Sequence, residues 1–113
     1  MKDVMLCVQP SPRVVPLIIE GADGTPEITM GSGHATVADT GTGIYTVTLT
    51  RAFARVPLIL LTPIIANTGD ELFAMLRSVA AGSFIIELSD DTGALTDGDV
   101  HVMVLGFESA SVR

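Results

Sequence analysis

The clearest periodic pattern in the chain runs from Gly41 to Leu49, in the order Gly-Thr-Gly-Ile-Tyr-Thr-Val-Thr-Leu. After the glycine-rich turn, the apolar side chains of Tyr45, Val47 and Leu49 alternate with threonines. Successive side chains in a β-strand point to opposite faces. The alternation therefore predicts a half-buried strand over 44–50 whose other face is lined with hydroxyl groups.

Further short apolar segments recur between turn sequences. The segment 72–80 fits helical spacing as well as alternation, and the short distance between its flanking turns favours a strand. Turns about every 8 to 12 residues are typical of antiparallel sandwiches and barrels. We therefore expect an all-β fold in one domain over 1–113, an antiparallel β-sandwich or jelly-roll-like barrel of about eight strands. The expected strands are 4–8, 14–20, 26–30, 35–38, 44–50, 58–65, 72–80, 84–88 and 100–107.

The segment 58–65, Leu-Ile-Leu-Leu-Thr-Pro-Ile-Ile, is apolar at both alternating positions. A strand buried on one face alternates, whereas a strand covered on both faces does not. One face would meet the opposite sheet, and we expect a neighbouring subunit to cover the other. Proline cannot donate to a strand ladder, so Pro57 and Pro63 place one end of this strand at an edge or kink, and Pro16 predicts an edge or bulge in 14–20. The predicted interface residues are Leu58, Leu60, Ile64 and Ile65.

The composition supports a contact with another subunit. Hydrophobic residues make up 48% of the 113 positions, charged residues only 17%, and the mean hydropathy is +0.54. The longest apolar stretch, 56–66, is interrupted by Pro57, Thr62 and Pro63, and a membrane helix needs about 18 uninterrupted apolar residues. The excess apolar surface predicts a homo-oligomer, because obligate interfaces resemble a domain core. A surface prone to aggregation is the alternative.

The charge pattern argues against nucleic acid as a ligand. The formal net charge is −7, and a duplex-binding surface needs clustered cations to neutralise phosphates. The arginines are instead scattered along the sequence, at Arg13, Arg51, Arg55, Arg77 and Arg113.

Cys7 is the only cysteine, so no intrachain disulfide and no thiolate metal cluster can form. It lies in the apolar segment 4–8, where we expect a buried small side chain. Five apolar residues are too few for a signal peptide, so we expect synthesis in a cytoplasm without export.

Each candidate catalytic group has a structural alternative that the sequence favours. His34 follows Gly31-Ser-Gly33 in a turn, and His101 lies in a predicted strand beside Met103 and Leu105. Neither histidine has a second ligand at metal spacing, and nothing local supports a dyad with Cys7. We expect a capping or solvated role for His34 and a packing or interface role for His101.

The acidic and glycine-rich stretches also favour turns over chemistry. Two Asp-Thr-Gly triplets, 39–41 and 91–93, invite an aspartic-protease interpretation, in which two carboxylates share a proton. A calcium site is conceivable for the carboxylate group, but the spacing does not match a calcium-binding loop. The glycines at 31–43 match no phosphate-binding loop. We predict no metal and no cofactor. The carboxylate group comprises Asp90, Asp91, Asp97 and Asp99.

Several segments between 25 and 107 together form a pattern of β-hairpins without catalytic signatures. They are Thr25-Pro-Glu-Ile28, the stretch 33–49 with its Thr-Gly-Thr-Gly-Ile-Tyr-Thr-Val-Thr-Leu sequence, Phe53, Pro57, the stretch 84–97 and the stretch 100–104. This pattern resembles small virion structural proteins of tailed bacteriophages, of the capsid decoration, cement or head-fibre type.

This resemblance implies a non-enzymatic β-sandwich that assembles, often as a trimer, on a virus particle. The implied partners are further copies and a major capsid protein or another virion protein, with no nucleic acid and no membrane. The implied location is the virion, after synthesis in a bacterial host. A glycan-recognising tip of a tail or head fibre shares the fold and is the alternative function. A small β-fold enzyme is a third hypothesis, which needs a base beside a nucleophile.

Overall fold

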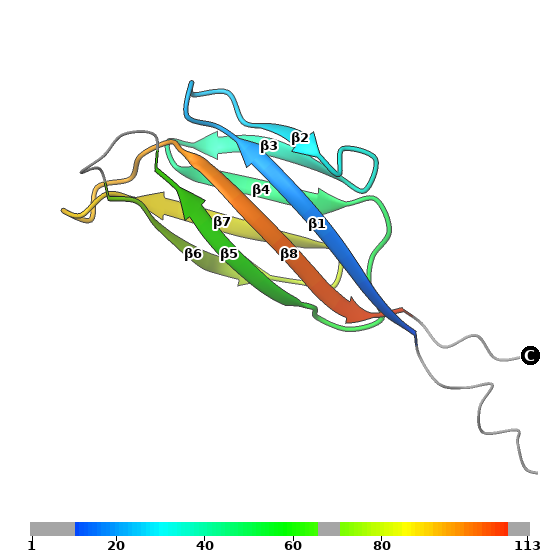
Figure 1. Cartoon of the computed structure of the whole chain (residues 1–113). Helices are drawn as coiled ribbons and strands as arrows, with labels where there is room; N and C mark the ends of the chain where they lie inside the picture. Colours follow the sequence, from blue (N-terminus) through cyan, green and yellow to red (C-terminus); the bar gives the residue numbers. More distant parts are fainter. Residues whose placement is uncertain (1–10, 66–70, 109–113) are drawn as a thin grey trace, which may run out of the picture.

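The computed structural model describes residues 11–65 and 71–108, which form eight β-strands (Figure 1). Seven of the expected strands coincide with these elements to within a few residues, and the shortest forms part of a longer strand. The expected strand 4–8, with Cys7, lies outside the described residues. The strands are β1 (Pro12–Glu20), β2 (Glu27–Met30), β3 (Ala35–Gly41), β4 (Ile44–Leu49), β5 (Leu58–Ile64), β6 (Phe73–Val79), β7 (Ser83–Ser89) and β8 (Asp99–Phe107).

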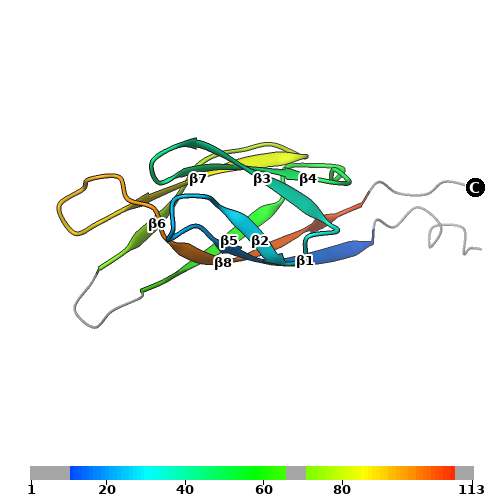
Figure 2. The ribbon, with the colours of Figure 1, turned by 90° about the horizontal axis from the view of Figure 1, so that it is seen from above.

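The strands form two four-stranded antiparallel sheets, with the orders β2-β1-β8-β5 and β3-β4-β7-β6. Seen from above, the sheets lie as two layers with β3, β4 and β7 over β1, β8 and β5 (Figure 2). The fold is therefore an all-β sandwich of eight strands, as predicted, and the two sheets do not close into a barrel. We call the two layers the β8 sheet and the β7 sheet, after a central strand of each.

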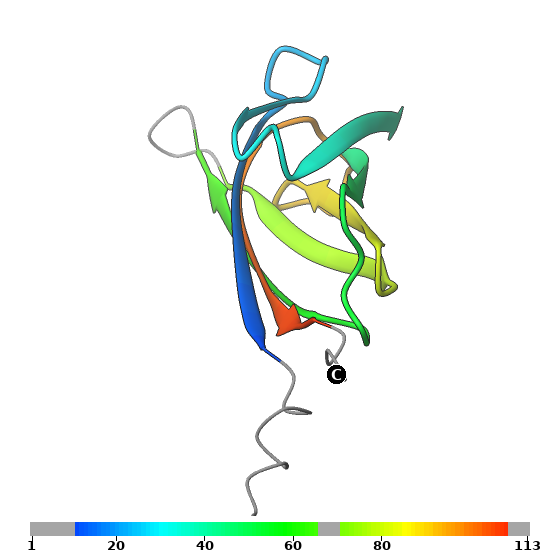
Figure 3. The ribbon, with the colours of Figure 1, turned by 90° about the vertical axis from the view of Figure 1, so that its right-hand side faces the viewer.

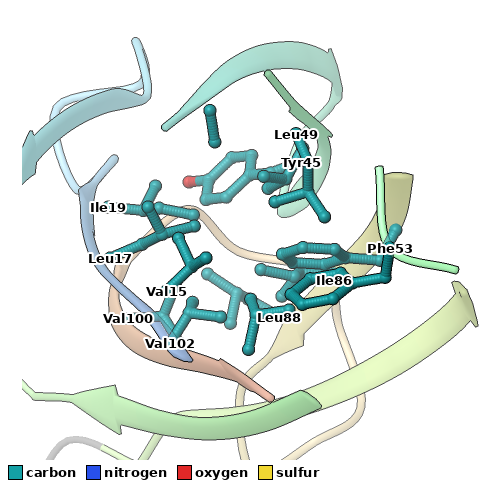
Figure 4. Packing of buried hydrophobic residues seen from close by; sticks show 14 residues of the cluster. Val15, Leu17, Ile19, Tyr45, Leu49, Phe53, Ile86, Leu88, Val100 and Val102 are labelled. Atoms are coloured by element: carbon teal, nitrogen blue, oxygen red, sulfur yellow. The ribbon is translucent and has the colours of Figure 1, made fainter. Parts of the chain in front are cut away.

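The core lies between the layers and takes alternate side chains from the central strands of both. Tyr45, Val47 and Leu49 of β4 are buried, as their alternation predicts, while Thr48 is exposed. Side chains of both sheets interdigitate around Tyr45 and Phe53 (Figure 4). The buried apolar residues are Val15, Leu17, Ile19, Ala35, Tyr45, Val47, Leu49, Phe53, Phe84, Ile86, Leu88, Val100, Val102 and Val104.

The segment 50–57 closes one end of this core as it crosses from the β7 sheet to the β8 sheet (Figure 3). Phe53 is 4% exposed, and the Arg13 guanidinium lies 4.2 Å from its ring centroid. The Ala54 amide donates to the Phe107 carbonyl at 2.9 Å. A cation over an aromatic face is attracted by the ring quadrupole, so Arg13 both covers Phe53 and is held by it.

The prolines behave as the sequence predicts. β5, with Pro63, is the edge strand of the β8 sheet. β1 lies inside that sheet, but β2 pairs only with Ile18, Ile19 and Glu20, with a register shift between the first two. Pro16 therefore lies in a stretch of β1 that pairs with β8 alone among the described strands, where its missing amide donor breaks no ladder.

The expected turn 39–43 is shorter in the structure. β3 continues through Gly41, which pairs with Ile44, and the hairpin turns on Thr42 and Gly43 alone. The Thr40 hydroxyl donates to the Ile44 carbonyl at 3.1 Å, and the Gly41 amide donates to Asp39 Oδ1 at 3.1 Å. These bonds and a register shift between Asp39 and Gly41 accommodate turn-forming residues inside a strand.

Candidate assembly surface

The outer face of the β8 sheet is apolar across three neighbouring strands. The register aligns Leu58, Leu105 and Val14 in one row across β5, β8 and β1, and Leu60, Met103 and Pro16 in the next. Of the six, Leu58 is 61% exposed, Val14 51%, Leu60 50% and Met103 42%. Antiparallel neighbours on one face lie about 5 Å apart, so these side chains form one continuous surface. We call these six residues the apolar face.

The apolar face has polar or mixed borders along the strands. The next row contains Thr62, His101 and Ile18, and the row after it contains Ile64, Asp99 and Glu20. Met30 extends the row of Thr62, His101 and Ile18 and is 49% exposed, whereas Phe107, at the other end of the strands, is 54% exposed. The surface therefore changes from apolar to acidic along the direction of the strands.

The outer face of the β7 sheet differs sharply from the apolar face. Its central rows align Thr36 with Thr48 and Ser83, and Ala38 with Thr46 and Ile85. Hydroxyl-bearing residues thus dominate the centre of this outer face, and its exposed apolar side chains, Phe73 and Met75, lie on the edge strand β6. Apolar side chains dominate the other outer face across three strands. Monomeric proteins rarely expose a contiguous apolar patch of this kind without using it for contact.

The four predicted interface residues fall into two groups. Leu58 and Leu60 belong to the apolar face, on its edge strand β5, whereas Ile64 and Ile65 line a cavity of about 420 Å³ at the acidic end of the sandwich. Their placement on exposed positions of β5 and just after it agrees with the sequence pattern, and their role in an interface stays a prediction.

The contributions of β1 and β8 to this surface were missed. Val14, Pro16, Met103 and Leu105 come from segments distant in sequence from 58–65, and only the pairing order brings them together. One feature of the sequence could have indicated the contribution of β8. Met103 and Leu105 occupy the alternate positions of β8 that a solvent-facing strand would fill with polar residues.

The acidic cavity brings together the carboxylates singled out in the sequence, and Asp90, Asp97 and Asp99 each hold a loop. Asp90, Asp91, Asp97 and Asp99 all line it, with Glu71 and Leu72. Asp97 Oδ1 accepts from the Gly43 amide at 2.8 Å, and Asp99 Oδ1 accepts from the Gly21 and Ala22 amides at 3.0 and 3.1 Å. Within 11–65 and 71–108, no group of three or more His, Cys, Asp or Glu residues is placed to hold a metal ion.

Asp90 is the clearest of these loop supports. Its Oδ1 accepts from the Thr92 hydroxyl at 2.6 Å, the Thr92 amide at 2.9 Å and the Ala94 amide at 3.0 Å. These hydrogen bonds to the charged form lower the pKa of the Asp90 carboxyl. The plain-turn interpretation therefore accounts for its geometry.

Tyr45 joins β4 to two loops at the same end. Its hydroxyl donates to Asp97 Oδ1 at 3.1 Å and accepts from the Gly98 amide at 3.1 Å, with the Gly21 carbonyl 3.3 Å away. Burial, together with the nearby Asp97 carboxylate, raises the pKa of Tyr45 to about 12. A hydroxyl that is buried, protonated and hydrogen-bonded in this way supports the structure. The ring that carries it is buried too and cannot stack on a sugar.

The two Asp-Thr-Gly triplets do not share the acidic cavity. Asp91 lines it, whereas Asp39 belongs to the β3–β4 hairpin and caps Gly41. An aspartic-protease site requires its two carboxylates within reach of one proton. The separate loop roles of the two triplets favour the turn interpretation made from the sequence.

The two histidines lie on different surfaces. His34 ends the turn after β2, where its amide donates to the Gly31 carbonyl at 2.9 Å and its carbonyl accepts from the Thr50 amide at 2.8 Å. It lines a cavity of about 320 Å³ with Arg13 and Arg51. His101 is exposed on β8 between Thr62 and Ile18, beside the apolar face as the sequence predicts.

Comparison with protein-family models gives no match to this chain, and comparisons with curated proteins and with solved structures give none. Within the described ranges, no helix is long and apolar enough to cross a membrane.

Proposed function

We propose that this chain is a non-enzymatic structural protein that self-associates through the apolar face. The observation that carries the proposal is the contrast between the two outer faces. Leu58, Leu60 and Met103 are between 42% and 61% exposed on one sheet, while Thr46 and Thr48 occupy the outward positions in the centre of the other. Burying such side chains is worth roughly 25 cal/mol per Å² of apolar surface removed from water, which favours a covered face.

We further propose that the assembled protein decorates or cements a bacteriophage capsid. This part rests on the sequence resemblance over 25–107, and the sandwich fold is compatible with it. Asp90 and Asp97 are hydrogen-bonded within loops and the Tyr45 ring is buried, which supports a structural role for these residues over a catalytic or sugar-stacking one.

Replacing Leu60 with Asp tests self-association. A carboxylate on the apolar face, beside Met103, would have to be desolvated in the complex, so Leu60→Asp should leave a folded monomer where the wild-type chain forms an oligomer. Light scattering after size exclusion gives the mass, and circular dichroism gives the fold. Thr48→Asp, on an exposed position of the other sheet, is the matched control and should remain oligomeric.

Two outcomes would contradict this account of the apolar face. One is a wild-type chain that is monomeric at micromolar concentration. The other is a Leu60→Asp variant that loses its β-sheet spectrum, since that result would place the Leu60 side chain in the core and not at an interface.

Particle fractionation tests the capsid part separately. Phage particles from the source of this sequence can be divided into heads and tails and probed with an antibody against the chain. We expect the signal with heads. A signal with tails, joined by reproducible binding on a glycan array, would favour a fibre tip instead.

A further inference from the structure

The charged residues of the described ranges are segregated along the strands. At the end where β1 finishes and β8 begins, nine carboxylates gather, and the nearest Lys or Arg of the described ranges, Arg77 on β6, is paired with Glu87. This end lies opposite to the one that carries the described termini (Figure 1). The nine are Glu20, Asp23, Glu27, Asp39, Glu71, Asp90, Asp91, Asp97 and Asp99.

The opposite end is basic. Arg13 lies near the start of β1, and Arg51 and Arg55 lie in the segment 50–57. Glu108 is the one carboxylate of the described ranges at this end. Glu108 lies 3.1 Å from Arg13 Nε and also pairs with Arg51. The remaining pair, Arg77 and Glu87 at 3.6 Å, is neutral as a unit. The sandwich therefore has an acidic end and a basic end, with the apolar face between them.

A second copy that covers the apolar face can lie with its strands in the same direction or in the opposite one. In the first arrangement, two sets of nine carboxylates come together. In the second, the acidic end of each copy meets the basic end of the other. Juxtaposed like charges disfavour a complex, and complementary potentials favour it. The same argument disfavours three copies around an axis along the strands, because all three acidic ends would meet.

We infer that the partner of the apolar face is a second copy in the opposite orientation, related by a two-fold axis that runs across the strands. This inference rests on the proposed self-association. Such an interface uses the same patch on both copies and closes as a dimer. Two sheets that face each other in this way can pack at about 10 Å with their strands inclined by roughly 30°. The acidic row with Glu20 and Asp99 then faces the basic end of the partner.

The sign of the salt dependence tests the orientation. Sedimentation equilibrium of the full chain at about 0.01 M and about 0.1 M NaCl spans Debye lengths of about 30 Å and about 10 Å. In the opposite orientation, salt screens an attraction, so the dimer should be present at both salt concentrations and its Kd should rise several-fold with salt. A Kd that falls with salt, or a trimeric mass, would overturn the orientation while leaving self-association intact. A monomer at both salt concentrations would overturn both proposals.

A charge substitution gives an independent test. Glu20→Gln removes one charge from the acidic border of the apolar face and keeps an oxygen that can accept from the Thr29 hydroxyl. The opposite orientation predicts a several-fold weaker dimer at low salt, whereas the same-direction arrangement predicts a tighter one. Asp39→Asn, on β3 of the other sheet, is the matched control and should change Kd less than Glu20→Gln does.

Discussion

At the residue scale, Tyr45 shows how one polar atom organises an end of the sandwich. Its ring is fully buried in the core, and its hydroxyl is bonded to Asp97 and Gly98 in the loop that leads into β8. A buried hydroxyl costs free energy unless it is hydrogen-bonded. The loop backbone supplies these bonds, and in return the hydroxyl fixes the loop.

Tyr45 also predicts how stability depends on pH. The model-peptide pKa of 10.0 is raised to about 12 in the folded chain, so between these values the unfolded state releases a proton that the folded state keeps. Stability is therefore unaffected by this group below pH 10 and falls as pH rises toward 12, by roughly 2 to 3 kcal/mol in total. Denaturant unfolding at several pH values measures the fall.

The Tyr45→Phe variant is the control for this titration, since it lacks the ionising group but keeps the ring. Its stability should be lower at neutral pH by roughly 1 to 3 kcal/mol, because the Asp97 and Gly98 groups lose a partner. Between pH 10 and pH 12 it should decline less than the wild-type chain. A parallel decline of both proteins would contradict the assignment to Tyr45. Because Tyr45 is the only tyrosine, tyrosinate absorbance reports its ionisation directly.

Gly43 is a second position where a single residue decides local structure. Its φ of +71° favours glycine, and an added Cβ would lie 2.6 Å from the Leu88 carbonyl oxygen and 2.7 Å from that of Thr96. Gly43→Ala should therefore cost about 3 kcal/mol or more, from backbone strain plus the displacement of two backbone segments. Gly93 is the matched control, with φ +87° and nothing within 4 Å of an added Cβ. Gly93→Ala should cost only about 1 kcal/mol. Equal losses in a denaturant comparison would contradict the close approach at Gly43.

At the scale of elements, the inner and outer positions of the strands were predictable from alternation. The pattern of β4 placed Tyr45, Val47 and Leu49 on one buried face. The doubly apolar pattern of β5 predicted a second apolar face, which carries the exposed Leu58 and Leu60, and its prolines predicted an edge or kink. Parity is a local property, so a single strand suffices to predict it. The segment 72–80, which fits both helical spacing and alternation, forms a strand as predicted. The short distance between its flanking turns favours a strand over a helix.

The pairing order was not predictable, and the surface depends on it. β1 and β8 are adjacent although about eighty residues separate them, and this pairing places Val14 beside Leu105. No local pattern specifies which strands pair across such a distance. The length of β3 was missed for a different reason: Asp39 and Thr40 satisfy their hydrogen bonds within a strand although they are common in turns.

Neighbouring residues of β7 test the inner and outer assignment directly. Ile86 is fully buried and Ile85 points outward, paired with Thr46. Ile86→Ala should cost about 2 to 5 kcal/mol through lost burial and an unfilled cavity, whereas Ile85→Ala should cost under about 1.5 kcal/mol. The two variants should be compared by urea unfolding at one protein concentration, since association adds to apparent stability. A larger loss for Ile85→Ala would reverse the assigned faces of the sheet.

At the scale of the whole molecule, two asymmetries coincide. One outer face is apolar across three strands and the other carries hydroxyl groups at its centre, while one end of the strands is acidic and the other basic. The first asymmetry gives a reason for copies to associate, and the second gives a reason for them to adopt one orientation. The composition alone predicted excess apolar surface. The net charge of −7 does not reveal that acidic and basic side chains lie at opposite ends of the strands.

The molar mass of the wild-type chain in solution tests the central claim most directly. Sedimentation equilibrium at micromolar concentration and low salt should give a mass that is a multiple of the 11.8 kDa chain, with the dimer as the expected species. The Leu60→Asp variant, folded by circular dichroism, should sediment as a monomer under the same conditions. A wild-type chain that sediments as a single 11.8 kDa species would contradict the assembly role of the apolar face.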